Sequence, residues 1–147
     1  MAVVKNATLP VNATVDASAN LTVTPNAINF PDADPDTVSS IPADSPLTVK
    51  LKVTGNANNG WQLTATANSD LLDPGSGTTI SASNISWTTT SGSFINGQLV
   101  VNSPQIVASG QGNANSTGVL SFFLANSWDY TPGTYNTTVT FTLTAPV

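Results

Sequence analysis

LTVKLKVT, residues 47–54, alternates apolar and polar side chains without interruption. A period of two places the apolar side chains on one face of an extended chain and the polar side chains on the other. This pattern predicts a half-buried β-strand with one face against a core and one face against solvent. The apolar positions are Leu47, Val49, Leu51 and Val53.

The same period recurs along the chain and is interrupted by turn residues. Residues 61–67 alternate directly after the Asn- and Gly-rich segment 55–60, which predicts a hairpin with residues 47–54. We expect further strands at 85–87, 99–101, 119–124 and 135–143, short or edge strands at 21–23 and 28–30, and a loop-rich segment at 103–116. Because no stripe of period 3.6 competes, the sequence predicts an all-β, immunoglobulin-like antiparallel β-sandwich of about seven to nine strands.

The ionisable composition limits the chemistry that this chain can perform. Its 147 residues suit a single domain, and they include no His, Cys, Arg or Glu, only eight Asp and three Lys. The absence of imidazole, thiolate and guanidinium groups removes the commonest catalytic and metal-binding designs, so we expect no enzyme and no catalytic residues. A net charge of −5 without a basic stripe also disfavours nucleic acid.

A neutral, polar surface points to the cell exterior. Thr, Ser and Asn supply 54 of the 147 residues, whereas charged residues supply 7% against about 25% in ordinary soluble domains. No stretch approaches the roughly 20 apolar residues of a membrane span, and no charged-then-apolar leader opens the chain. We therefore expect an extracellular or cell-surface protein whose signal peptide has been removed.

Three segments resemble known surface proteins. WDYTPGTYNTTVTFTLTAP, residues 128–146, resembles the closing hairpin of bacterial and archaeal immunoglobulin-like surface modules, and GWQLTATA, residues 60–67, resembles a strand of such domains. NLTVTPNAINF, residues 20–30, resembles the opening of pilus-like and spore-coat-U-like fibre subunits. The resemblance implies a β-sandwich that assembles into extracellular fibres by strand donation. Within residues 128–146, Asp129, Gly133 and Tyr135 also resemble the tyrosine corner of sandwich folds, with a plain core tyrosine as the alternative.

Acidic residues gather in the Pro-rich segment PDADPDT. Carboxylates at alternate positions could offer several oxygens to Ca²⁺, which takes six to eight oxygen ligands. The alternative is a solvated acidic turn in which Asp side chains accept hydrogen bonds from backbone amides. The candidate calcium ligands are Asp32, Asp34, Asp36 and Asp44.

The tryptophans are candidates for carbohydrate contacts, since a flat apolar ring with a polar edge suits sugar recognition. Trp61 and Trp87 lie in the apolar phase of their strands, so burial in the core is favoured for them. Trp128 lies at a turn beside Asp129, and Tyr130 could join it as an exposed sugar contact.

Residues 1–16 form a separate segment before the domain of residues 17–147. This arm alternates like a strand around Pro10, yet the domain already holds enough strands to close a sandwich. Either the arm is the first strand of its own sandwich, or it completes the sheet edge of a neighbouring copy and so links copies into a homopolymer. We therefore expect a structural subunit of a filament or surface layer; the alternative is a monomeric surface-binding module for carbohydrate or Ca²⁺. The donor contacts would be Val3, Leu9, Val11 and Val15.

Overall fold

The computed structural model describes residues 1–55 and 58–145. These residues form antiparallel sheets and one short 3₁₀-helix, which confirms the predicted all-β sandwich; their eleven strands include several of only two or three residues. The elements are β1 (Ser18–Thr24), β2 (Ser40–Pro42), β3 (Leu47–Thr54), β4 (Gly60–Ala67), β5 (Leu71–Leu72), β6 (Thr79–Ile80), η1 (Ala82–Asn84), β7 (Ile85–Thr88), β8 (Gly97–Gln98), β9 (Gln105–Gln111), β10 (Ala114–Ala125) and β11 (Val139–Thr144).

The first layer of the sandwich is organised around the long strand β10. The first half of β10 pairs with β3, and its second half pairs with β7 and β2, so the strand order is β1-β3-β10-β7-β8. β1 pairs only with β3 among the described strands, with Leu21 opposite Leu51 and Val23 opposite Val49. β1 is therefore the edge strand of this layer.

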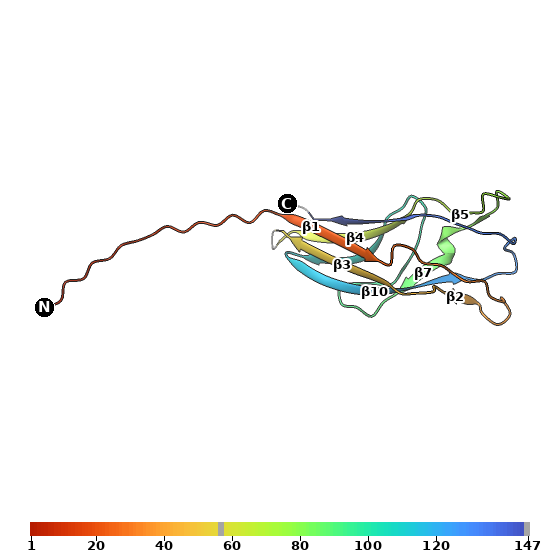
Figure 1. Ribbon diagram of the computed structural model, residues 1–147, viewed down its shortest axis with the longest axis horizontal. Coiled ribbons are helices and arrows are strands. Elements are labelled where there is room, and N and C mark those ends of the chain that lie inside the picture. The colour runs from red at the N-terminus through yellow and green to blue at the C-terminus, as the bar shows by residue number, and fades with distance from the viewer. Residues whose placement is uncertain (56–57, 146–147) are drawn as a thin grey trace.

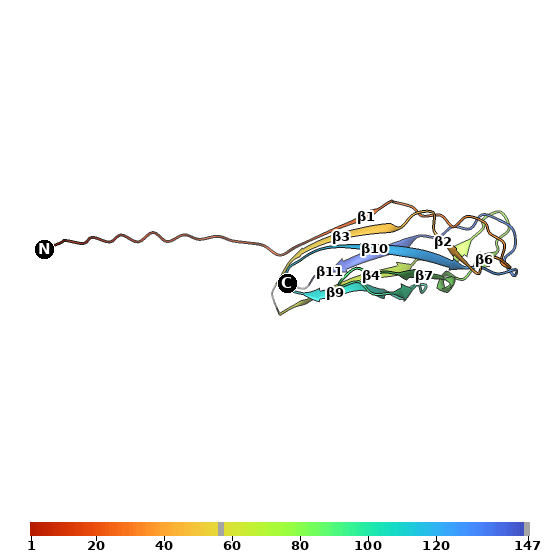
Figure 2. The same cartoon turned by 90° about the horizontal axis from the view of Figure 1, so that it is seen from below.

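The second layer contains three antiparallel strands in the order β11-β4-β9. Figure 2 shows this layer facing the layer of β1, β3 and β10. The predicted hairpin of residues 47–54 with 61–67 is wrong: β3 pairs with β1 and β10, whereas the next strand, β4, crosses to the other layer and pairs with β11 and β9. β5 and β6 form a small two-stranded sheet at the end of the body opposite the arm (Figure 1). β11 is an edge strand, since its pairing partner is β4 alone among the described strands.

The core lies between the layers and follows the period-two pattern of the sequence. In β3 the four apolar residues are buried, while Lys50 and Lys52 are exposed. Trp61 and Trp87 are 4% and 1% exposed, which confirms that these two rings belong to the core. β10 is buried on alternate residues rather than on both faces, and Val119 remains exposed.

Glycines make room for the two buried indole rings. A Cβ atom at Gly97 would lie 2.3 Å from the Trp87 ring, and one at Gly110 would lie 2.7 Å from the Trp61 ring. Each glycine lies on the strand that pairs with the strand of its tryptophan. The rings therefore pack directly over the backbone of the neighbouring strand, which only a residue without a side chain permits.

The expectation of a loop-rich segment at 103–116 is wrong. β9 and the start of β10 occupy most of it, because β9 pairs with β4 and is held against the Trp61 ring at Gly110. The small polar residues of this segment give no alternating signal, and the tertiary pairing overrides their weak local preference.

Tyr135 makes the hydrogen bond that defines a tyrosine corner. Its hydroxyl donates to the backbone carbonyl of Thr131, four residues upstream, and lies 2.9 Å from the Thr78 hydroxyl. Its ring packs against the core. Tyr135 thus fixes the segment that leads into β11, where the strand begins at Val139, four residues later than the start expected at 135.

Candidate functional site

The arm that precedes β1 lies apart from the sandwich. Residues 1–17 are all exposed and belong to no strand, and Figure 1 shows them projecting from one end of the body. Val3, Leu9, Val11 and Val15 are 81–84% exposed. An extended chain carries these four odd-numbered side chains on one face. The arm therefore presents an apolar stripe to solvent.

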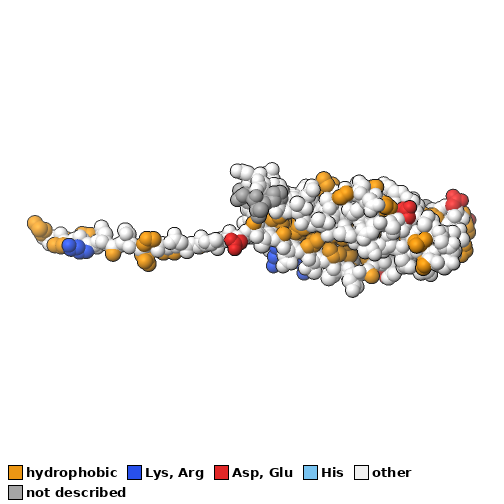
Figure 3. All heavy atoms as spheres, turned by 90° about the horizontal axis from the view of Figure 1, so that it is seen from above, with side chains coloured by type: hydrophobic (Ala, Val, Ile, Leu, Met, Phe, Trp, Pro, Cys, Tyr) orange, Lys and Arg blue, Asp and Glu red, His pale blue; other side chains and the backbone are white. Residues whose placement is uncertain are grey.

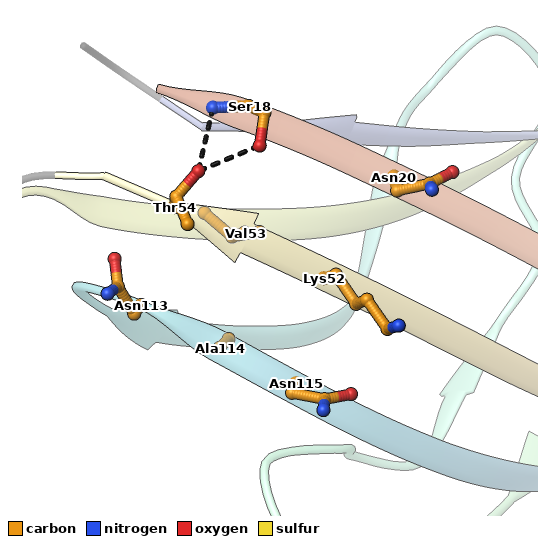
Figure 4. Close-up of a pocket in the computed structure, with 8 residues that line it drawn as sticks. All are labelled: Ser18, Asn20, Lys52, Val53, Thr54, Asn113, Ala114 and Asn115. Carbon is orange, nitrogen blue, oxygen red and sulfur yellow. Dashed lines mark hydrogen bonds between the residues drawn. The ribbon is translucent and has the colours of Figure 1, made fainter. Parts of the chain in front are cut away.

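The base of the arm is fixed by hydrogen bonds to the end of β3. The backbone N–H of Ser18 donates to the Thr54 hydroxyl at 3.0 Å, and the two hydroxyl oxygens are 2.7 Å apart (Figure 4). The Thr54 hydroxyl also lies 3.3 Å from the Asp16 carbonyl. These contacts lie in an open depression on the outer face of β1, β3 and β10, where Lys52 is the one ionisable residue among the described residues that line it. They determine where the chain leaves the body.

An apolar seam runs along one side of the body, between the edge strands β1 and β11. We use this name for the core-facing side chains of the two strands, which remain only half-buried and pack against the edge of the core. Figure 3 shows a band of hydrophobic side chains on this side of the molecule. Both edge strands thus expose part of the core. The seam residues are Leu21, Val23, Val139, Phe141 and Leu143.

The opposite side of the sandwich is covered by the segment between β7 and β8. The Ile95 N–H donates to the Val107 carbonyl of β9, and the Phe94 ring, 6% exposed, packs against β10 at Gly118. The Ser91 hydroxyl accepts a hydrogen bond from the Val119 N–H of β10 at 3.1 Å. One side of the core is therefore covered by a connecting segment, whereas on the seam side β1 and β11 contact each other and leave their core-facing side chains half-buried.

Three of the four aspartates proposed to bind calcium, Asp34, Asp36 and Asp44, accept separate hydrogen bonds. The Asp34 carboxylate accepts from the Asp36 N–H at 2.9 Å, and the Asp44 carboxylate accepts from the Asn29 backbone and side chain at 3.0 and 3.2 Å. The Asn29 bonds lower the pKa of Asp44 below its usual value. Within 1–55 and 58–145, no three carboxylates come together as a metal ligand set, and Asp32 has no role in these bonds. Calcium binding stays a prediction that this geometry does not support.

The two residues proposed to contact sugar lie close in sequence but differ in exposure. Trp128 is 69% exposed, and its indole N–H donates to the Asp36 carboxylate at 2.9 Å. The Tyr130 hydroxyl is occupied, because it donates to the Ala125 carbonyl and accepts from the Asn84 amide at 3.1 Å. Burial raises the pKa of Tyr130 above its usual value. Trp128 thus offers a free ring face, whereas Tyr130 serves the loop structure.

Sequence reasoning did not single out the seam residues as a site. It placed them on apolar faces of strands, and period-two alternation does not distinguish an edge strand from a central one. Their half-burial follows from the strand order, in which β1 and β11 each have one neighbour among the described strands. No helix in the described part of the chain is long and apolar enough to cross a membrane.

No protein-family model matches the sequence, and no curated protein is detectably similar to it. The fold and the surface define an antiparallel β-sandwich that carries an exposed apolar arm and a half-buried apolar seam.

Proposed function

We propose that this protein is an extracellular structural subunit that assembles into a filament or surface layer by donating its arm to the sheet edge of another copy. The observation that carries this proposal is the coexistence of an exposed apolar stripe on the arm and a half-buried apolar seam on the body. Each valine or leucine that moves from water into a core contributes about 1.5–3 kcal/mol. Burying the stripe against the seam would therefore supply several such contributions at once.

The position of the arm favours donation to another copy. An extended segment of 16 residues reaches about 50 Å, and Figure 1 shows the arm directed away from its own body. A donated strand gains backbone hydrogen bonds along an edge and seats alternate side chains in the core. Because the donor and acceptor surfaces differ, the contact is head-to-tail and repeats from copy to copy, which generates a filament.

The surface composition supports an extracellular location for such an assembly. With charged residues at 7% of the chain, neighbouring subunits repel each other little. The polar groups that remain are mainly hydroxyls and amides, which stay neutral across the pH range that an exposed structure meets. The lack of cysteine leaves assembly independent of the redox state of the surroundings.

Electron microscopy and size-exclusion chromatography of the purified chain test the proposal. We expect polymers from the full chain and monomers from a chain without residues 2–16. The isolated body should keep its unfolding temperature, because no arm residue belongs to its sheets. Monomers from both chains at high concentration would refute the assembly function.

A second candidate function is a monomeric module that binds carbohydrate on the body, and the exposed ring of Trp128 favours it. In this case Trp128→Ala should abolish binding on a glycan array and leave assembly unchanged. Because the ring is 69% exposed, its removal should alter the free energy of unfolding by less than about 0.5 kcal/mol. An array without bound glycans would remove this candidate.

A further inference from the structure

The backbone of β11 directs alternate residues toward its free edge. The Thr138 carbonyl accepts from the Asn68 N–H at 2.9 Å, and the register places these two residues directly opposite each other. In an antiparallel pair, every second residue bonds to the partner strand and the residues between them point away. The backbone N–H and C=O groups of Val139, Phe141 and Leu143 therefore face away from β4. Their side chains belong to the apolar seam.

The direction of the arm favours one of the two edge strands, β1 or β11, as the strand to which it is donated. β1 begins at the end of the body from which the arm projects, and β11 ends there (Figure 1). If copies follow one another along the arm with the same orientation, a donated arm runs antiparallel to β11 and parallel to β1 of the acceptor. Folded back onto its own body, the arm would run parallel to β11 instead. Antiparallel pairing is the more stable of the two per residue.

The alternation of apolar residues in the arm fits the hydrogen-bonding pattern of β11, and the position of Pro10 fits it as well. Odd-numbered arm residues from 7 to 15 are apolar, so they face the core. Opposite residues of an antiparallel pair share a face, so odd arm residues lie opposite Val139, Phe141 and Leu143, which bond toward the free edge. The odd arm residues must then form the backbone bonds to β11. Pro10, which has no N–H, falls at an even position, where none is needed.

We infer that the acceptor site for the arm is the free edge of β11 in a second copy. The arm runs antiparallel to that strand, its odd-numbered residues bond to the acceptor backbone and fill the seam, and its even-numbered residues face away. This inference rests on the proposed function. It adds the identity of the acceptor strand, the direction of the arm relative to that strand, and which arm residues form the backbone hydrogen bonds.

Proline substitution in the full chain tests which arm residues bond to β11, because proline removes one backbone donor. Ala13→Pro deletes a donor that the inference assigns to β11, and it should weaken assembly by about tenfold or more. Asn12→Pro deletes a donor that faces away and should weaken assembly by less than about threefold. The arm is outside the sheets of the monomer, so neither variant has a folding defect to confuse the result.

Hydrogen exchange in the assembled chain tests the acceptor strand. The amides of Val139, Phe141 and Leu143 should exchange at least about tenfold more slowly in the polymer than in the monomer. Equal sensitivity to the two prolines, or protection at Leu21 and Val23 of β1 instead, would overturn the inference while leaving strand donation intact. Absence of assembly by the unaltered chain would overturn the proposed function and this inference with it.

Discussion

Shortening two apolar side chains of the arm separates assembly from folding. Leu9→Ala with Val11→Ala removes five methyl or methylene groups, each worth about 0.8 kcal/mol when buried. If both side chains are buried in the acceptor seam, the double variant loses about 4 kcal/mol of association free energy, an increase of about 10³-fold in the dissociation constant. Since Leu9 and Val11 are 83% and 84% exposed in the monomer, the unfolding temperature of the monomer should not change.

Sedimentation equilibrium measures the association, and thermal unfolding at a concentration below assembly measures the monomer. The matched control is Thr8→Ala with Asn12→Ala, which shortens side chains on the other face of the arm and should change the dissociation constant by less than about threefold. A monomer that becomes several degrees less stable on loss of Leu9 and Val11 would show that the arm packs on its own body. Equal effects of the two double variants would show that the apolar face has no special role.

Two further predictions concern the body. Gly97→Ala places a Cβ atom 2.3 Å from the Trp87 ring and should destabilise the fold by about 1–3 kcal/mol in urea unfolding; Gly92→Ala, which meets nothing within 4 Å, should not, and equal losses would contradict the packing argument. Because hydrogen bonds from Asn29 lower the pKa of Asp44 in the folded chain, the charged carboxylate stabilises the fold at pH values above the usual pKa of an aspartate, and this contribution disappears as the pH falls through the lowered value. The difference in unfolding temperature between the unaltered chain and Asp44→Asn should therefore be largest near neutral pH and vanish in strong acid; a difference that does not depend on pH would contradict it.

The strands with strict alternation could be predicted from the sequence, and those held by tertiary contacts could not. Residues 47–54 form β3 with the predicted bounds, because every second side chain is large and apolar. β9 was missed because its buried side chains, Val107 and Ala108, are adjacent rather than alternate, and its contact with the Trp61 ring is made at a glycine, Gly110. The burial of Trp61 and Trp87 followed from their phase in the strands.

One part of the candidate site, the arm, could be predicted from the sequence, and the other part, the seam, could not. The arm is visible in the sequence because its apolar residues alternate outside the strands that close the sandwich. The seam cannot be recognised in the sequence, since Phe141 and Leu143 alternate with polar residues as the apolar residues of any half-buried strand do. Their exposure depends on which strand is the neighbour of β11, and strand order is a long-range property that local patterning does not encode.

Disulfide formation between two different single-cysteine chains tests the central claim most directly, because the chain has no cysteine of its own. One chain carries Thr142→Cys on the outer face of β11, and the other carries cysteine at Thr8, Asn12 or Thr14 of the arm. Outward-facing opposite residues would be non-hydrogen-bonded pairs with Cα atoms about 4.5 Å apart, within the range of a disulfide. We predict a cross-linked pair of chains for at least one even position and none for Ala13→Cys. Cross-links at no even position, in chains that do assemble, would contradict the account.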